Sequence, residues 1–195
     1  MIPINGLPLI EYIINHLKRY GITDIIIAVG RQGRQIRNYC RDGSRFGVKI
    51  TYSTSRSPLG TAGEVWNAAK LIKDRFLCYY GDILTNIPLD RLIRTHEKSN
   101  NLVTIAVKRG YRLLIGIVKI DSDGKVLEIV EKPVLDLDVT FGIFIAEKEL
   151  LKYVGKHLDF GYDVFPSLIR DKKPIGVCYF NEYEWFDIGT MQQVS

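Results

Sequence analysis

The stretch Asp24-Ile25-Ile26-Ile27-Ala28-Val29 decides the fold class, because it is a nearly continuous aliphatic run of strand length. Runs of this kind are typical of strands that are covered on both faces, as in a parallel sheet. Before it, apolar residues at helical spacing follow Pro8, and Gly21 comes after the last of them. The chain is therefore predicted to open with a helix that leads into a buried strand.

The same order of helix and strand is predicted twice more. A helix from Gln32 to Cys40 precedes a strand from Val48 to Tyr52, and a helix marked by Val65 to Ile72 precedes a strand from Phe76 to Tyr80. This repetition predicts an α/β fold, namely a Rossmann-like α/β/α sandwich with right-handed crossovers and a mixed, mostly parallel central sheet.

The second half of the chain adds strands that pair locally. Val126 to Val130 follows Ile115 to Ile120 after the turn Asp121-Ser122-Asp123-Gly124, which is a hairpin signal. No linker, low-complexity tract or internal repeat interrupts the pattern, so we expect residues 1–195 to form a single domain. The other predicted elements are helices at Leu89–Lys98, Lys148–Val154 and Asp163–Ile169 and strands at Leu102–Val107 and Val139–Ile145.

Composition narrows the class of partner. The chain has 195 residues, 46% hydrophobic and 25% charged, as in one ordinary globular domain. Its net charge of +5 comes from basic residues interspersed with acids, which favours a phosphorylated metabolite over nucleic acid. No apolar run approaches the length of a membrane span, and the three cysteines are widely separated. We therefore expect a cytoplasmic protein with no membrane partner.

Two aspartates each end an apolar run. Asp82 closes the run from Phe76 to Gly81, and Asp187 closes the run from Tyr183 to Phe186. Ligands of open α/β sheets bind outside the carboxyl ends of strands, and Mg²⁺ prefers carboxylate oxygens. Brought together by the fold, the two acids could hold Mg²⁺ against a substrate phosphate. The alternative for each is a turn or a helix cap.

Two further segments could bind a ligand. The small-residue loop Leu59-Gly60-Thr61-Ala62-Gly63 runs into a helix, where glycines allow close approach and free N–H groups attract anions. In Glu131-Lys132-Pro133, Glu131 could accept hydrogen bonds from sugar hydroxyls and Lys132 could neutralise a phosphate. The alternatives are a tight strand-to-helix connection for the loop and an exposed strand end for the charged pair.

Seven motifs, taken together and in this order, resemble the sugar nucleotidyltransferase family, also called nucleotide-sugar pyrophosphorylases. The motifs are Pro8–Tyr12, Asp42–Ile50, Leu59–Gly63, Gly81-Asp82, Val130–Pro133, Asp163–Pro166 and Trp185–Thr190. The resemblance implies that a sugar 1-phosphate attacks the α-phosphorus of a nucleoside triphosphate, which gives nucleotide-sugar and pyrophosphate. The implied types are mannose 1-phosphate guanylyltransferase and glucose 1-phosphate uridylyl- or thymidylyltransferase.

The resemblance also assigns roles to single residues. Asp82 and Asp187 match the Mg²⁺ ligands, and both are expected to be catalytic together with Lys132. Gly81 and the loop residues Leu59, Gly60, Thr61, Ala62 and Gly63 match the nucleotide pocket. Glu131, Lys132 and Gly142 match positions that bind the sugar phosphate.

The chain departs from the family pattern at its start. Family members usually begin with a strand and a G-G-x-G-T-R-L loop followed by a Lys-Pro pair, and Met1 to Gly6 aligns just after that pair. We therefore expect a sheet without its usual first strand and a site without its triphosphate cradle, and no C-terminal β-helix domain. An uncovered sheet edge would favour a homodimer. The alternative function is a non-catalytic nucleotide-sugar-binding or regulatory paralogue.

Overall fold

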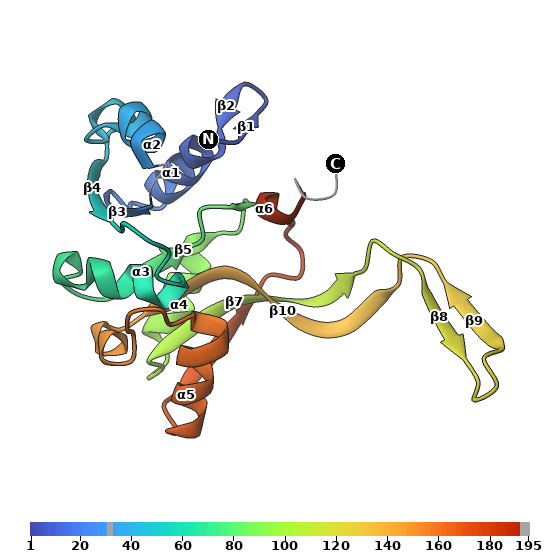
Figure 1. The fold of residues 1–195 in the computed structure, drawn as a ribbon. Coiled ribbons are helices and arrows are strands. Elements are labelled where there is room, and N and C mark those ends of the chain that lie inside the picture. The colour runs from blue at the N-terminus through green and yellow to red at the C-terminus, as the bar shows by residue number, and fades with distance from the viewer. Residues whose placement is uncertain (31–32, 192–195) are drawn as a thin grey trace.

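Helices and strands alternate through the first half of the chain in the computed structural model, which describes residues 1–30 and 33–191 (Figure 1). Helix α1 (Leu9–Arg19) leads into β3 (Asp24–Val29), as predicted from the opening pattern. Helix α2 spans Gly33–Cys40, and its expected start at Gln32 lies outside the described residues. In this part of the chain no helix is long and apolar enough to cross a membrane.

The remaining predicted elements occur in the predicted order with shifted ends, together with short elements that were not predicted. In the first half they are β1 (Pro3–Ile4), β2 (Leu7–Pro8), η1 (Ser44–Phe46), β4 (Lys49–Thr54), α3 (Thr61–Ala68), η2 (Ala69–Leu71), β5 (Phe76–Tyr79), β6 (Ile83–Thr85) and α4 (Leu89–Glu97). In the second half they are β7 (Val103–Arg112), β8 (Ile117–Ile120), β9 (Val126–Val130), β10 (Val134–Ala146), η3 (Lys148–Lys152), η4 (Phe160–Val164), α5 (Phe165–Arg170), β11 (Ile175–Tyr179), β12 (Trp185–Asp187) and α6 (Ile188–Met191).

The central sheet has four strands in the order β11-β7-β10-β5. Strand β11 is parallel to β7, whereas β10 is antiparallel to both β7 and β5. Three of the four strands therefore run in one direction and β10 alone opposes them. The prediction of a mixed, mostly parallel sheet is confirmed.

Strand β10 is buried on both of its faces from Phe141 to Ala146. Phe141, Ile143 and Ile145 pack with α1 and α4 in one hydrophobic cluster. Phe144 and Ala146 pack with α3 and α5 in a second cluster. Because successive side chains of a strand point to opposite faces, this division means that helices cover both sides of the sheet. The α/β/α sandwich is confirmed.

A gap in the strand order lies between β3 and β5. Strands β3 and β4 form a separate parallel pair, and among the described residues β3 pairs with β4 alone and β5 with β10 alone. A cavity of ≈ 820 Å³ lies between them, lined by Ile25–Ala28 of β3 and by Leu77–Tyr80 at β5. Two strand edges thus border one cavity, as expected for a sheet that lacks its usual first strand.

Strands β8 and β9 form the predicted hairpin, which projects from the ends of β7 and β10 away from the helices (Figure 1). We call residues 117–130 the arm. Other elements differ from the prediction, because the segment after Lys148 is a 3₁₀-helix and the strands β1, β2, β6 and β11 were not expected. The helix expected at Asp163 is preceded by a π-helical turn that begins at Phe160, since Asp159 caps it by accepting hydrogen bonds from two backbone N–H groups.

Removing a β10 core side chain should destabilise the sheet. Ile143 is fully buried, so Ile143→Ala is expected to lower the free energy of unfolding by about 2–5 kcal/mol through lost contacts and the cavity it leaves. Ile169, on α5, is 67% exposed, and Ile169→Ala should change this free energy by less than about 0.5 kcal/mol. Urea unfolding followed by circular dichroism measures both, and equal losses would contradict the central position of β10.

Candidate active site

The fold brings Asp82 and Asp187 together. Asp82 Oδ2 and Asp187 Oδ1 lie 3.1 and 3.2 Å from the point where a Cβ atom on Gly189 would stand, so the two carboxylates converge on one position. The backbone N–H of Ile188 donates to the carbonyl oxygen of Asp82 at 2.9 Å, which fixes the two segments against each other. The predicted convergence of the two acids is confirmed.

The route by which Asp187 arrives differs from the expectation. We expected both acids at the carboxyl ends of strands in the main sheet, but β12 pairs antiparallel with β6 in a separate two-stranded ribbon. In this ribbon Asp187 stands opposite Ile83, the residue that follows Asp82. The pairing of β12 with β6, which the local sequence does not reveal, therefore brings Asp187 to Asp82. The expected edge of the main sheet does not do so.

Long-range hydrogen bonds hold the segment that carries Asp187. The N–H of Phe180 donates to the carbonyl oxygen of Val107 at 2.8 Å, which continues the β11–β7 pairing. Lys108 Nζ donates to the carbonyl oxygen of Tyr183 at 2.8 Å, and Thr85 Oγ1 donates to that of Glu184 at 2.8 Å. The position of Asp187 is thus set by β6 and β7 together.

The electrostatics of the pair favour a cation. Desolvation of the Asp82 carboxylate raises its pKa, and the nearby negative charge of Asp187 raises it further, against the lowering effect of a backbone hydrogen bond. Two like charges at one position cost energy in the ionised state, and a bound cation removes that cost. The pair is therefore poised to bind positive charge.

The two aspartates suit a Mg²⁺ ion that keeps some of its waters better than a structural metal ion that is enclosed by protein side chains. Among the described residues no group of three or more His, Cys, Asp or Glu side chains could hold a metal ion. Mg²⁺ usually keeps several waters and is bound by one or two carboxylates together with substrate phosphates. Two converging aspartates fit that requirement.

The small-residue loop begins helix α3, but its N–H groups are already occupied. The N–H groups of Ala62 and Gly63 donate to the carbonyl oxygen of Leu158 at 3.1 and 3.0 Å. Thr61 Oγ1 donates to Asp159 at 2.6 Å. The expectation of free N–H groups that attract an anion at this helix start is wrong, because a distant loop caps it.

Close packing around the loop explains two of its glycines. Gly60 has a φ of +79°, and a Cβ atom there would lie 2.3 Å from the Leu158 carbonyl oxygen. At Gly63 a Cβ atom would lie 2.8 Å from the Leu59 side chain. Leu59 itself is buried. The loop therefore has a packing role, and its predicted nucleotide contacts remain a prediction.

Gly142 lies beside the segment that leads to Asp82. Its carbonyl oxygen accepts a hydrogen bond from the N–H of Tyr80 at 3.0 Å, and its φ is +69°. A Cβ atom on Gly142 would lie 2.9 Å from the Tyr80 ring. Gly81 follows Tyr80 and is exposed, with nothing within 4 Å of the position of a Cβ atom. The structure thus brings Gly81 and Gly142 to the vicinity of Asp82.

Glu131 and Lys132 lie elsewhere, in the connection between β9 and β10. Both side chains are exposed, and Lys132 has a φ of +48°. Glu131 Oε2 is 2.7 Å from the position of a Cβ atom on Gly116, at the base of the arm. Within residues 1–30 and 33–191 no hydrogen bond or ion pair joins Lys132 to Asp82. Their role toward a sugar phosphate remains a prediction.

Comparison with known proteins assigns the chain to a family. The model of the family described as Nucleotidyl transferase matches residues 1–194. The chain belongs to the nucleotidyl transferase family. A UTP–glucose-1-phosphate uridylyltransferase of Synechocystis sp. is 31% identical, and the match covers 97% of this chain and 54% of that protein.

Two further comparisons agree. A D-glycero-alpha-D-manno-heptose 1-phosphate guanylyltransferase of Campylobacter jejuni is 29% identical over 97% of this chain and 84% of the relative. The crystal structure of HddC from Yersinia pseudotuberculosis has a TM-score of 0.77 at 22% identity and covers 97% of this chain and 83% of that one, which supports the fold. This nucleotidyl transferase chain spans about half the length of its relatives from Synechocystis and Mycobacterium tuberculosis.

The cavity between β3 and β5 opens onto the candidate site of this nucleotidyl transferase chain. Thr61, Glu64, Gly81 and Asp82 line one part of it. Glu64 Oε1 accepts a hydrogen bond from Ser55 Oγ at 2.7 Å, whereas Glu64 Oε2 is buried and has no hydrogen-bond partner among the described residues. A buried carboxylate oxygen without a donor is costly, so a donor from a ligand or another segment would stabilise this wall.

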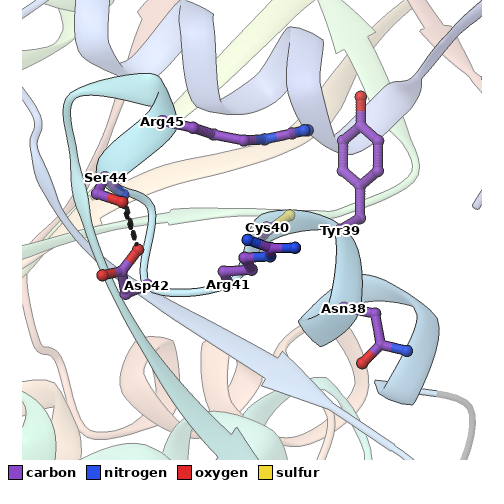
Figure 2. A pocket seen from close by; sticks show the side chains of 7 residues that line it. All are labelled: Asn38, Tyr39, Cys40, Arg41, Asp42, Ser44 and Arg45. Atoms are coloured by element: carbon purple, nitrogen blue, oxygen red, sulfur yellow. Dashed lines mark hydrogen bonds between the residues drawn. The ribbon is translucent and has the colours of Figure 1, made fainter.

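A second, smaller hollow of ≈ 300 Å³ is lined by residues 38–42, 44 and 45 and is shown in Figure 2. Several of its side chains already contact one another. Asp42 accepts hydrogen bonds from the N–H and hydroxyl of Ser44, which lower the pKa of Asp42. The Arg45 guanidinium lies over the Tyr39 ring at 4.0 Å. The start of the motif Asp42–Ile50 therefore has a structural explanation, and this hollow is separate from the candidate site.

Sequence reasoning missed two residues that shape the site. Burial of Tyr80, between the loop and Gly142, raises the pKa of its hydroxyl to about 12, despite a hydrogen bond with Thr61. Burial also raises the pKa of Asp159, but hydrogen bonds from Thr61, Gly161 and Tyr162 outweigh it and hold this pKa below the usual value. An aspartate before Phe160-Gly161 is a helix-cap signal that could have revealed Asp159.

Substitution of Gly60 should disturb the loop. Gly60→Ala places a methyl group against the Leu158 carbonyl oxygen in a left-handed backbone conformation, so we expect the free energy of unfolding to fall by about 1–3 kcal/mol. Gly81→Ala is the matched control, because a Cβ atom there meets nothing within 4 Å. Chemical unfolding measures both variants, and equal stability of the two would contradict the close contact.

Proposed function

We propose that this chain carries out Mg²⁺-dependent nucleotidyl transfer from a nucleoside triphosphate to a sugar 1-phosphate. The observation that carries the proposal is the convergence of Asp82 and Asp187 beside the Thr61 loop in a member of the nucleotidyl transferase family. The relatives named as uridylyl- and guanylyltransferases act on glucose 1-phosphate, mannose 1-phosphate and a heptose 1-phosphate. The same substrate class is proposed here.

The reaction needs no protein nucleophile. A phosphate oxygen of the sugar 1-phosphate forms a bond to the α-phosphorus of the triphosphate. The bond between the α-phosphorus and the oxygen that bridges the α- and β-phosphates breaks, and pyrophosphate leaves with the electron pair. Such phosphoryl-type transfers depend on alignment and charge neutralisation. When bound, Mg²⁺ supplies positive charge that neutralises phosphate oxygens as they react.

The chain's own residues would align the substrates. Asp82 and Asp187 hold fixed negative charge at one position, since the β6–β12 ribbon and the Ile188 hydrogen bond set their backbones. Gly81 leaves open space next to Asp82, and Gly142 allows Tyr80 to pack closely against β10. Glu131 and Lys132 are proposed to bind the sugar phosphate, which requires the connection between β9 and β10 to approach the acids. We also propose a cytoplasmic location, in keeping with three free cysteines.

A non-catalytic nucleotide-sugar-binding role is the second candidate. The observation that favours it is the cavity between β3 and β5, where no described residue supplies a strand or phosphate-binding loop. Hydrogen-bond donors aimed at the α-phosphate are often worth several kcal/mol of barrier. The chain of residues 1–195 alone would then bind ligand with little or no turnover.

Pyrophosphate release separates the two candidates. The assay compares the chain with a version extended at its N-terminus by an apolar strand and a G-G-x-G-T-R-L loop, across several triphosphates and sugar 1-phosphates. We expect the extended version to release pyrophosphate only when both Mg²⁺ and a sugar 1-phosphate are present. Binding of nucleotide-sugar without pyrophosphate release in either version would reject the catalytic proposal.

In the active version, Asp82→Asn should lower turnover at least about a hundredfold, because it removes one of two negative charges that would hold the metal. Asp123→Asn, in the turn of the arm, is the matched control and should leave turnover unchanged. Unchanged turnover in Asp82→Asn would reject the metal role of this residue.

Acidification should weaken Mg²⁺ binding. A proton on Asp82 competes with the metal, and because desolvation and Asp187 raise the pKa of Asp82, the competition begins at higher pH than for an ordinary aspartate near 3.9. Calorimetric titration should show weaker binding at pH 4.5 than at pH 7. Asp82→Asn should lose that pH dependence, and equal affinity at both pH values would contradict the assignment.

A further inference from the structure

The arm carries two chemically different faces. In the β8–β9 register, Val118 stands opposite Ile129, and Ile120 stands opposite Val126 after a register shift between Lys119 and Ile120. An extra residue in β9 at this shift lets the two pairs share one face. On the other face, Lys119 stands opposite Glu128 and forms an ion pair with it at 2.5 Å, next to the half-buried pair Ile117 and Val130 at the base of the arm. An antiparallel hairpin with one aliphatic and one charged face is built to pack its aliphatic face against another apolar surface.

In the chain by itself, that aliphatic face is uncovered. Val118, Ile120, Val126 and Ile129 are 53, 62, 57 and 66% exposed. Figure 1 shows the reason, because the arm projects away from the helices and the sheet. Isolated two-stranded hairpins are at best marginally stable in water, so a partner surface would stabilise the arm as well as cover it.

We propose that the aliphatic face of the arm docks against the same face of a second copy of this chain. Two such faces would stack as two layers of a small sandwich related by a two-fold axis, with Val118 and Ile129 of each copy at the centre. This inference does not depend on the proposed nucleotidyl transfer.

The available area suits a dimer. At these exposures each large aliphatic side chain presents roughly 100 Å² to solvent. Leu114, Ile115 and Leu127 are 73, 66 and 67% exposed and extend the surface along the arm and its base. The four face residues by themselves offer about 400 Å² of apolar surface per copy. This is about half of the roughly 800 Å² that each partner contributes to a standard interface, and about half of such an interface is apolar.

The charge distribution permits a second copy to bind. The chain has a net charge of +5, so two copies repel each other unless their contact surfaces are free of unpaired cations. The four face residues are uncharged, and Lys119 is paired with Glu128 on the opposite face. Self-association through the aliphatic face therefore puts no like charges into contact.

Sedimentation velocity between about 1 and 100 µM tests the proposal. The chain is expected to form dimers, and Ile129→Lys is expected to raise the dimer dissociation constant about a hundredfold or more, because it buries a charge in the apolar contact. Ser122→Lys adds the same charge at the tip of the arm and should remain dimeric. A monomeric wild-type chain, or a dimeric Ile129→Lys variant, would overturn the proposal.

Hydrogen exchange supplies a readout that does not require a variant to fold. The amides of residues 117–130 should gain protection as the concentration of the wild-type chain rises. Protection that is independent of concentration would mean that the arm folds back on its own body, and a monomer with unprotected arm amides would mean that a different partner covers the face. Either result would overturn the proposal.

Discussion

The ladder between β6 and β12 is the constraint on which the candidate active site depends. It places Asp187 opposite Ile83 and therefore next to Asp82, although most of the second half of the chain separates the two acids. Loop-closure entropy opposes so distant a contact. The parallel pairing of β11 with β7 and the hydrogen bond from Lys108 to the Tyr183 carbonyl oxygen hold the returning segment close to β6. The β6–β12 ribbon therefore does not bear the whole entropy cost of the long loop.

That geometry is electrostatically unfavourable in the chain alone. Two carboxylates converge at one position, and no salt bridge to Asp82 is present in the described part of the chain. The backbone hydrogen bonds of the ribbon hold the two acids together against their repulsion. Such an arrangement suits a position where a cation or a reacting phosphate is to be bound.

Local pattern was sufficient for much of the fold. The aliphatic run at Asp24–Val29 and the strand at Val126–Val130 have the predicted bounds, because burial and turn signals act on adjacent residues. Local pattern did not reveal contacts between residues that are far apart in the sequence. The capping of Ala62 and Gly63 by Leu158 joins segments almost a hundred residues apart in sequence, and nothing near Thr61 reveals it. For the same reason the pairing of β12 with β6 could not be inferred from the Trp185–Asp187 run.

The arm connects the sugar-phosphate prediction to the position of a distant surface. Strand β9 runs directly into Glu131 and Lys132, and β10 begins at Val134, so these two residues cannot move far independently of the two strands. Fixing the position of the arm therefore also fixes the connection. If the arm is free, a ligand that contacts Lys132 has to order the connection between β9 and β10, and the entropy cost of this ordering lowers the affinity for the ligand. In a dimer formed through the arm, the order would exist before the ligand arrives, so the aliphatic face and the charged connection would contribute to one binding event.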